Sequence, residues 1–230
     1  KGINERSSCI NKRRTVITMT LSQYFICFII YSFLGWVYES LFYSFQFKKP
    51  VNTGFLHGCI CPIYGLVCVM NIAFLGKVKS EAAIFVASMI TVSVTEYVVS
   101  YLLEHLFGKR WWDYSDWPLN LNGRISLISS LGFGAMSLIQ LRLLHPAIMK
   151  VVLHIPAGTM KLITILFIVW VFFDLCLTVR DMDKTDDRLW FIDEESETIR
   201  QANEKLEEKK KRLSLRYGNV KERIRDAFGR

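Results

Sequence analysis

The sequence predicts an all-α membrane protein, a polytopic bundle of about five transmembrane helices followed by a charged C-terminal helical tail. Hydrophobic residues make up 51% of the 230-residue chain and the mean hydropathy is +0.25, which is too apolar for a typical soluble domain. The apolar residues also fall into blocks, and a membrane-spanning helix needs about 20 such residues. Five blocks are bounded by charge or by Pro and Gly: 24–47, 59–75, 82–107, 125–144 and 160–179.

These blocks divide the chain into three parts. Residues 1–18 are a basic tail that lacks the cleavage site of a signal peptide, and we expect the native chain to start at Met19, directly before the first block. Residues 19–181 are the expected transmembrane bundle. Residues 182–230 are the expected charged tail, on the cytoplasmic side.

Two of the blocks carry features that predict their packing. Pro62 and Gly65 interrupt the short second block, so its first turns are expected to be re-entrant. The fourth block presents one stripe of small residues, which lets another helix approach closely. The stripe consists of Ser126, Ser130, Gly134 and Ser137. Between the fourth and fifth blocks, residues 146–158 are too short to span a membrane, and Lys150 and His154 favour an interfacial helix there.

The tail is charged and has few apolar residues. Apolar side chains recur at every seventh position: Ile192, Ile199, Leu206, Leu213 and Val220. One apolar residue per heptad is weak for a coiled coil. We therefore expect a solvated helix, with self-association or docking to a partner as the alternatives. A Lys/Arg-rich tail favours the cytoplasmic side, so we expect a multi-pass protein of the cell membrane with its C-terminus inside.

The formal net charge of +8 does not indicate nucleic-acid binding. Acidic and basic residues nearly balance in the C-terminal tail, and the remaining basic residues sit mostly in the N-terminal tail and at helix ends, where they meet lipid headgroups. The lipid bilayer is therefore the expected partner. No His–Cys set has the spacing of a zinc site, so we expect free thiols, no metal and no cofactor.

Ionisable residues inside the apolar blocks predict a polar site, because such residues are costly in a membrane. Glu39 shares one helical face with Ser32, Gly35 and Tyr43 in the first block, and Glu96 and Glu104 share one face of the third. In alternating helices these positions come to the same side of the membrane. The substrate-binding residues that we predict at this depth are Glu39, His57, Tyr64, Glu96, Tyr97, Glu104, Asp113, Asn120, Asn122, Arg124 and Asp174.

The segment RWWDYSDWPLNLNGR, residues 110–124, joins the third and fourth blocks on that side. An aromatic belt at the headgroups accounts for Trp111 and Trp117. It does not account for Asp113, Asn120 or Asn122, so we expect this loop to belong to the polar site. Glu39, Glu96 and Arg124 are predicted to meet in a polar cavity open toward the C-terminal side. The alternative is internal pairing, in which Arg110 or Arg124 neutralises these carboxylates and locks the bundle.

Several segments resemble the CmpB family of ABC-transporter permeases, also called ABC-transporter type IV. They are YSFLGWVYES, GFLHGCICPIYG, EYVVSYLLE, RWWDYSDWPLNLNGRIS and FDLCLTV, in this order between Met19 and Val179. The resemblance implies a permease subunit. No GxxxxGK[ST] loop occurs in the chain, so a permease would need a separate ATPase subunit, and five spans imply a homo-oligomer.

Three functions follow from these observations. The first is a transporter subunit whose polar pocket lies at the cytoplasmic leaflet. The second is a non-catalytic membrane scaffold whose tail recruits a partner protein. The third is a membrane-embedded enzyme acting on lipid, for which the carboxylates would be the acid–base groups. No Ser-His-Asp or HExxH arrangement supports an enzyme, so we predict the transporter subunit.

Overall fold

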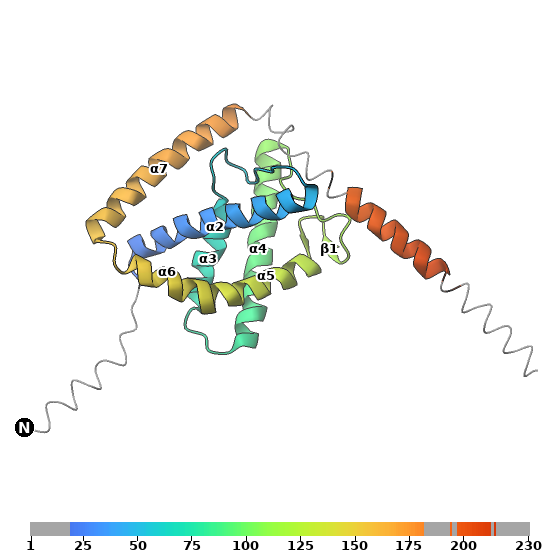
Figure 1. The fold of residues 1–230 in the computed structure, drawn as a ribbon, viewed down its shortest axis with the longest axis horizontal. Helices are drawn as coiled ribbons and strands as arrows, with labels where there is room; N and C mark the ends of the chain where they lie inside the picture. Colours follow the sequence, from blue (N-terminus) through green and yellow to red (C-terminus); the bar gives the residue numbers. More distant parts are fainter. Residues whose placement is uncertain (1–18, 182–193, 195–196, 213, 215–230) are drawn as a thin grey trace, which may run out of the picture.

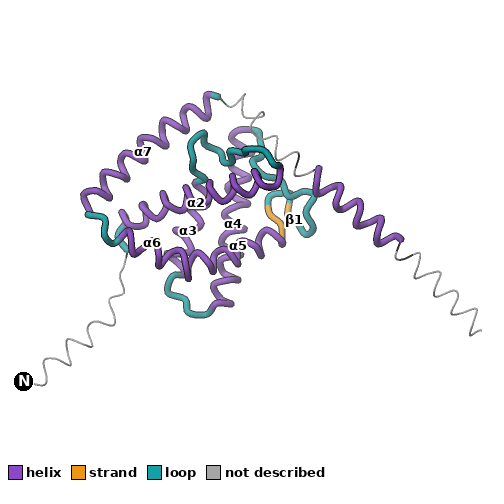
Figure 2. The backbone as a smooth tube through the Cα atoms, in the orientation of Figure 1, coloured by secondary structure: helices purple, strands orange, loops and turns teal. Residues whose placement is uncertain are grey.

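The computed structural model describes residues 19–181, 194, 197–212 and 214. The predicted all-α bundle is confirmed, because helices form most of residues 19–181 and the strands there are limited to one short pair (Figure 2). The predicted N-terminal tail, and Ile192, Leu213 and Val220 of the predicted heptads, lie outside the described residues. Residues 197–212 are helical and largely exposed.

Four stretches of helix are long and apolar enough to cross a membrane (Figure 1). They are α2 (Leu21–Phe47), α4 (Glu81–Phe107), the continuous stretch Leu127–Val152 and α7 (Ala157–Arg180). The prediction of five spanning helices was therefore wrong by one. The second block forms only α3 (Pro62–Leu75), and 14 residues at 1.5 Å each give about 21 Å, less than the hydrocarbon thickness of a bilayer.

An extended segment, residues 48–61, accounts for the shortness of α3. The segment leaves the end of α2 and turns back along it until the N–H of Cys61 donates to the carbonyl of Ser32, 2.9 Å away, in the middle of α2. There α3 begins, with Pro62 in its first turn, where the missing N–H costs nothing. The break predicted at Pro62 thus occurs, and the part of the block before it is not helical.

The long stretch Leu127–Val152 is built from three pieces: α5 (Leu127–Ile139), the π-helical turn η1 (Gln140–Leu144) and α6 (His145–Val152). The prediction of a separate interfacial helix over 146–158 was wrong, because the helix continues past Pro146 to Val152. The π turn explains how. The N–H of His145 bonds to the carbonyl of Gln140, five residues back, and this widened turn sits directly before Pro146, which has no N–H to donate.

Small residues bring the helices into close contact. A Cβ added at Gly35 of α2 would overlap the ring of Tyr64, and one at Gly65 of α3 would overlap Ser32. In α5 a Cβ at Gly134 would lie 3.1 Å from the ring of Phe85 on α4. The small-residue stripe predicted for the fourth block is therefore a packing face, as the buried residues of α5 are Ser130, Gly134 and Ser137.

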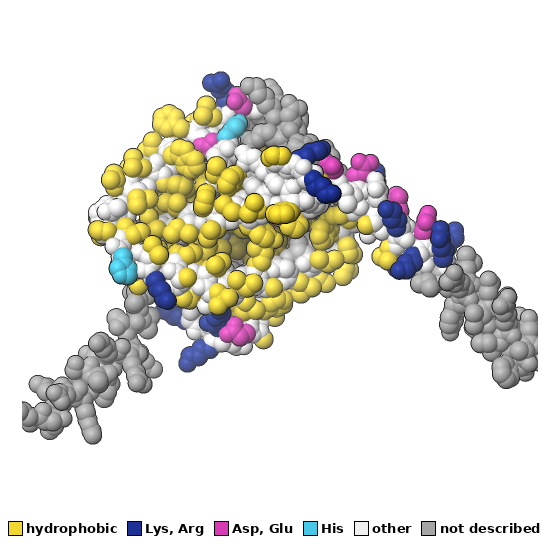
Figure 3. Space-filling model, in the orientation of Figure 1, with side chains coloured by type: hydrophobic (Ala, Val, Ile, Leu, Met, Phe, Trp, Pro, Cys, Tyr) yellow, Lys and Arg dark blue, Asp and Glu magenta, His cyan; other side chains and the backbone are white. Residues whose placement is uncertain are grey.

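The apolar core lies at the end of the bundle where α2, α4 and α7 begin. Its buried members come from each of the long helices and from α3: Ile26, Cys27, Tyr31, Ile72, Ile84, Leu141, Val152 and Met160. Elsewhere the helices leave large apolar side chains exposed (Figure 3), as expected for surfaces that face lipid. The opposite end of the bundle carries the loop between α4 and α5.

Candidate functional site

The loop between α4 and α5 ends in a small hairpin. Strand β1 (Asn120–Leu121) pairs with β2 (Ile125–Ser126) in antiparallel register. The connection needs two left-handed residues, Asn122 with φ 54° and Gly123 with φ 68°. The side chain of Asn120 accepts a hydrogen bond from the N–H of Gly123 at 3.1 Å. Asn–Gly supplies both left-handed positions at low cost, which explains this part of the loop sequence.

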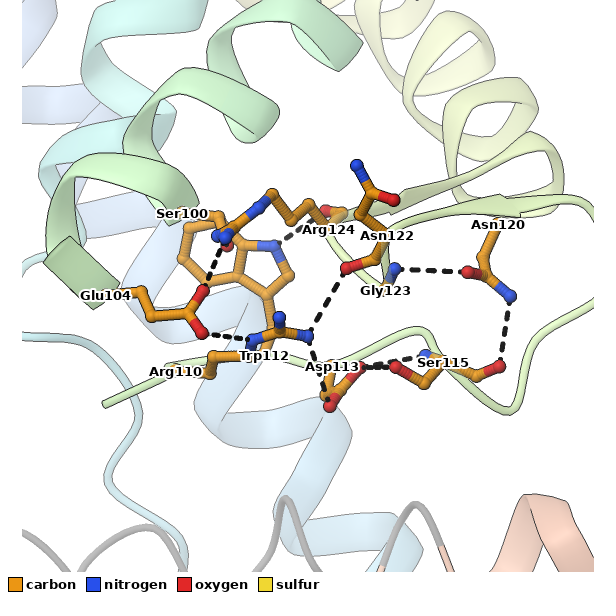
Figure 4. A network of polar contacts seen from close by, with 10 residues as sticks. All are labelled: Ser100, Glu104, Arg110, Trp112, Asp113, Ser115, Asn120, Asn122, Gly123 and Arg124. Carbon is orange, nitrogen blue, oxygen red and sulfur yellow. Dashed lines mark hydrogen bonds and ion pairs between the residues drawn. The ribbon is translucent and has the colours of Figure 1, made fainter. Parts of the chain in front are cut away.

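Two arginines attach the loop to α4 (Figure 4). Nη2 of Arg124 lies 2.6 Å from Oε2 of Glu104, and its Nη1 donates to the hydroxyl of Ser100 at 3.2 Å. Nε of Arg110 lies 3.0 Å from the other oxygen of Glu104, and its Nη1 lies 3.6 Å from Asp113. Glu104 thus bridges the two ends of the loop. We call Glu104, Arg110 and Arg124 the loop clamp.

Further contacts around the loop clamp involve the other predicted residues of the loop. The guanidinium of Arg124 lies 5.7 Å from the ring centre of Tyr97, whose hydroxyl accepts from Nδ2 of Asn122 at 3.0 Å. Oδ1 of Asp113 accepts from the backbone N–H and the hydroxyl of Ser115. Every polar side chain of this group therefore has a structural role in holding the loop.

A cavity of about 430 Å³ lies between α2, α3, α4, the π-bulged helix and the loop. Its walls are mainly apolar and aromatic, and its charged lining residues, among those that the structure describes, are Glu39 and Glu96. A cavity of this size matches the volume of a small organic ligand. Glu39 and Glu96 therefore line one cavity, as predicted. The prediction that the cavity is polar was wrong, because its walls are mainly apolar.

Glu96 is the most deeply placed charged group in the cavity. Its residue is 6% exposed, and Oε1 accepts a long hydrogen bond of 3.5 Å from the hydroxyl of Tyr114. Oε2 is buried and has no hydrogen-bond partner among the residues that the structure describes. A buried carboxyl oxygen without a partner is costly, and such groups call for an explanation beyond packing.

Glu39 reaches the same cavity from α2. The thiol of Cys61 donates to its Oε2 at 3.2 Å, and both side chains line the cavity. Next to them the hydroxyls of Ser40 and Thr53 lie 3.0 Å apart. The extended segment is therefore fastened to α2 beside the carboxylate, and it forms part of the cavity wall through Gly54 and Phe55.

Arg124 does not line this cavity, so the prediction that it meets Glu39 and Glu96 was wrong. The physical reason is that Glu96 and Glu104 compete for Arg124. Glu104 lies two helical turns beyond Glu96 on α4 and is the carboxylate that Arg124 contacts. The alternative of internal pairing expected Arg110 or Arg124 to neutralise Glu39 or Glu96, whereas both arginines pair with Glu104. It does not describe the two carboxylates of the cavity, since no Lys, Arg or His is among the described residues that line it.

His57 and Asp174 form a third group, away from both the cavity and the loop clamp. Oδ2 of Asp174 accepts from the N–H of Gly58 at 2.9 Å. The hydroxyl of Thr178 lies 2.7 Å from Nδ1 of His57 and accepts from its backbone N–H. These bonds attach the C-terminal part of α7 to the extended segment. Of the remaining predicted residues, Tyr64 lines the cavity.

Three aromatic residues of the loop line the cavity and were not predicted as site residues: Trp111, Trp112 and Tyr114. Trp112 also donates from Nε1 to the carbonyl of Arg124 at 3.1 Å, so the loop clamp holds its ring in place. The sequence signal was present, because three bulky aromatics lie within four positions beside charged residues. Trp111 was instead assigned to an aromatic belt at the headgroups, whereas the structure buries it.

The comparisons with known proteins agree with this architecture. A family model described as "Putative ABC-transporter type IV" matches residues 26–179. The chain belongs to the ABC-transporter type IV family. The matched region of this ABC-transporter type IV protein contains the cavity, the loop clamp and all of α3, α4, α5 and α6. Comparisons with curated proteins and with solved structures gave no match.

Family membership and four apolar helices together make the chain a multi-pass membrane protein related to transporters. The resemblance drawn from the sequence motifs is thereby confirmed. No group of His, Cys, Asp and Glu side chains within residues 19–181 is placed to hold a metal ion. The cavity is therefore the strongest candidate for a functional site in the described part of this ABC-transporter type IV protein.

Proposed function

We propose that this chain is the membrane subunit of a transporter and that its cavity receives the transported solute. The observation that carries the proposal is Glu96, a carboxyl group buried beside a cavity in an apolar bundle, with one oxygen that has no partner among the described residues. Ionisable groups at such depth are rare and typically mark solute or ion pathways. The family match supports the same class of function.

Energy for transport would come from a second protein. The sequence has no GxxxxGK[ST] loop, so ATP would be hydrolysed by a separate ATPase subunit that binds the cytoplasmic face. The bundle would act as a homo-oligomer, since four spanning helices are few for a permease. We place the C-terminal tail and the loop clamp on the cytoplasmic side, because the tail is rich in Lys and Arg.

A pair of tryptophan substitutions on α4 tests the proposal. Val99 lines the cavity, whereas the neighbouring Val98 is exposed on the outside of the same helix. Val99→Trp should fill the cavity, and Val98→Trp adds the same side chain where lipid can accommodate it. Both variants replace the native chain in its own cells, and the small molecules of the cytosol and the medium are measured by mass spectrometry.

We expect at least one solute to change its distribution between cytosol and medium when the chain is deleted. Val99→Trp should reproduce the deletion, and Val98→Trp should behave as the native protein. An unchanged distribution on deletion would contradict a transport function and would favour a scaffold. A change that Val98→Trp and Val99→Trp affect equally would contradict the assignment of the cavity as the solute site.

A further inference from the structure

The cavity has the chemistry of a site for a cation with an apolar body. Both of its charged lining residues are acidic, and no Lys, Arg or His is among the described residues that line it. The two arginines of the loop, Arg110 and Arg124, are already paired with Glu104. An anion would therefore meet two carboxylates and no basic group among the described lining residues, so the cavity disfavours it.

The walls define the rest of the ligand. Aromatic rings from separate elements surround the space, among them Tyr38 of α2, Tyr64 of α3 and Trp111 of the loop. Tyr38 and Tyr64 lie with their ring centres 6.5 Å apart in an edge-on arrangement, and Trp111 packs against Phe55 at 5.1 Å. Aromatic faces attract cations and bury apolar surface, a combination that suits ammonium compounds.

The unpartnered oxygen of Glu96 gives the position of the positive charge. Oε2 is buried without a hydrogen bond among the described residues, in a side chain that lines the cavity and is 6% exposed. A cationic centre placed against it would supply the missing partner. A small hydrated metal ion fits less well, because it needs several oxygen ligands at short range and the described residues offer no such cluster.

We infer that the cavity binds an amphiphilic organic cation, with its charged centre against Glu96 and Glu39 and its apolar body against the aromatic walls. This inference rests on the proposed function in one respect, namely that the bound cation is the transported solute. Binding itself does not depend on transport. The two claims can therefore fail separately.

Two probes of the same shape and opposite charge test the inference on the unmodified protein. Radiolabelled tetraphenylphosphonium is the cation and tetraphenylborate is its anionic counterpart. Equilibrium dialysis against the purified full-length chain in nonionic detergent, with empty micelles as the blank, gives both affinities. We expect the cation to bind at least tenfold more tightly than the anion. Equal affinities, or a preference for the anion, would overturn the inference.

Substitutions then locate the bound cation. Glu96→Gln keeps the shape of the side chain and removes its charge, and it should weaken tetraphenylphosphonium binding at least tenfold. The control is Glu81→Gln, at the far end of α4, where the carboxylate pairs with Arg142 on the surface. Val99→Trp should abolish binding. Binding that survives Glu96→Gln unchanged would refute the assigned position, and the probe comparison decides alone if that variant does not fold.

The combined results separate the two claims. Preferential cation binding with no effect of the chain on solute distribution in cells would leave the inference standing and refute the transport function. A cavity-dependent transport of a neutral or anionic solute, with no binding of tetraphenylphosphonium, would leave the function standing and refute the inference.

Discussion

The guanidinium of Arg124 lies 2.6 Å from the carboxylate of Glu104, and this ion pair holds the loop against α4 outside the cavity. Only 11% of the Arg124 side chain and 32% of the Glu104 side chain are exposed, so the pair is partly shielded from water. The basic charge of the loop is thus used for structure. The cavity, in turn, is lined by two other acidic side chains, Glu39 and Glu96.

We expect Arg124→Ala to destabilise the protein by about 1.5–3 kcal/mol, the usual cost of losing hydrogen bonds to a charged group. The substitution removes the ion pair with Glu104 and the bond to Ser100, and it frees the loop that carries Trp112. Lys at position 124 should restore the stability only in part, because it lacks the planar group that contacts both partners. Thermal unfolding in detergent compares the stability of the native protein, Arg124→Ala and Arg124→Lys.

Arg142→Ala, in η1, is the matched control. Nε of Arg142 donates to the carboxylate of Glu81, and its Nη2 donates to the carbonyls of Val78 and Lys79. These contacts are exposed, and exposed ion pairs contribute about 0–1 kcal/mol. We therefore expect a smaller loss than for Arg124→Ala. Equal losses would mean that the loop clamp is no more important than a surface pair.

Gly65→Ala should disrupt the packing of α3 on α2. The added Cβ would meet Ser32 and the backbone carbonyl of Phe28, and a backbone atom in a helix cannot move aside cheaply. Overpacking of this kind costs about 1–3 kcal/mol. Gly132→Ala in α5 is the control, since a Cβ there has nothing within 4 Å. It should leave the stability unchanged or raise it by up to about 1 kcal/mol. The idea is wrong if both alanines behave alike in thermal unfolding.

Much of the helical framework could be predicted, because hydropathy depends on local sequence. The blocks 24–47, 82–107 and 160–179 correspond to α2, α4 and α7 within a few residues. The shared depth of Glu39 and Glu96 also followed from alternating helices. The π turn before Pro146 could not be predicted, because it depends on how one backbone turn widens and leaves no hydropathy signal.

The pairing of charges could not be predicted either. Depth alone places Glu96, Glu104 and Arg124 on one side of the membrane, and all three could have met. The observed partner depends on the path of the hairpin, which the left-handed conformations of Asn122 and Gly123 set. His57 and Asp174 lie outside the cavity for the same kind of reason. Their position depends on where the extended segment 48–61 turns back along α2.

Asp174→Ala should loosen the C-terminal part of α7. The carboxylate accepts the N–H of Gly58, and its removal leaves that donor without its partner, at a cost of about 1–3 kcal/mol. Asp181→Ala is the control, because its carboxylate pairs with exposed Arg180 at the end of the helix. Thermal unfolding should show a loss for Asp174→Ala alone. A comparable loss for Asp181→Ala would refute a specific role for the Gly58 contact.

A chain that ends after Thr185 should still form the membrane bundle. Residues 197–212 are largely exposed, and Leu206 is 50% exposed. Their contact with the loop includes one hydrogen bond, from Asn203 to the carbonyl of Asp116 at 2.7 Å. We expect the shortened protein to insert into membranes and to unfold within a few degrees of the full chain. Rapid degradation or failure to insert would show that the tail stabilises the bundle.

If the cavity beside Glu96 holds a small molecule, native mass spectrometry of the protein released from its own membranes should detect it. The full chain and Val98→Trp should each carry one additional non-covalent mass, and Val99→Trp should carry none. A native protein without such a mass, or a mass that stays bound when Val99→Trp fills the cavity, would show that the cavity is not a small-molecule site.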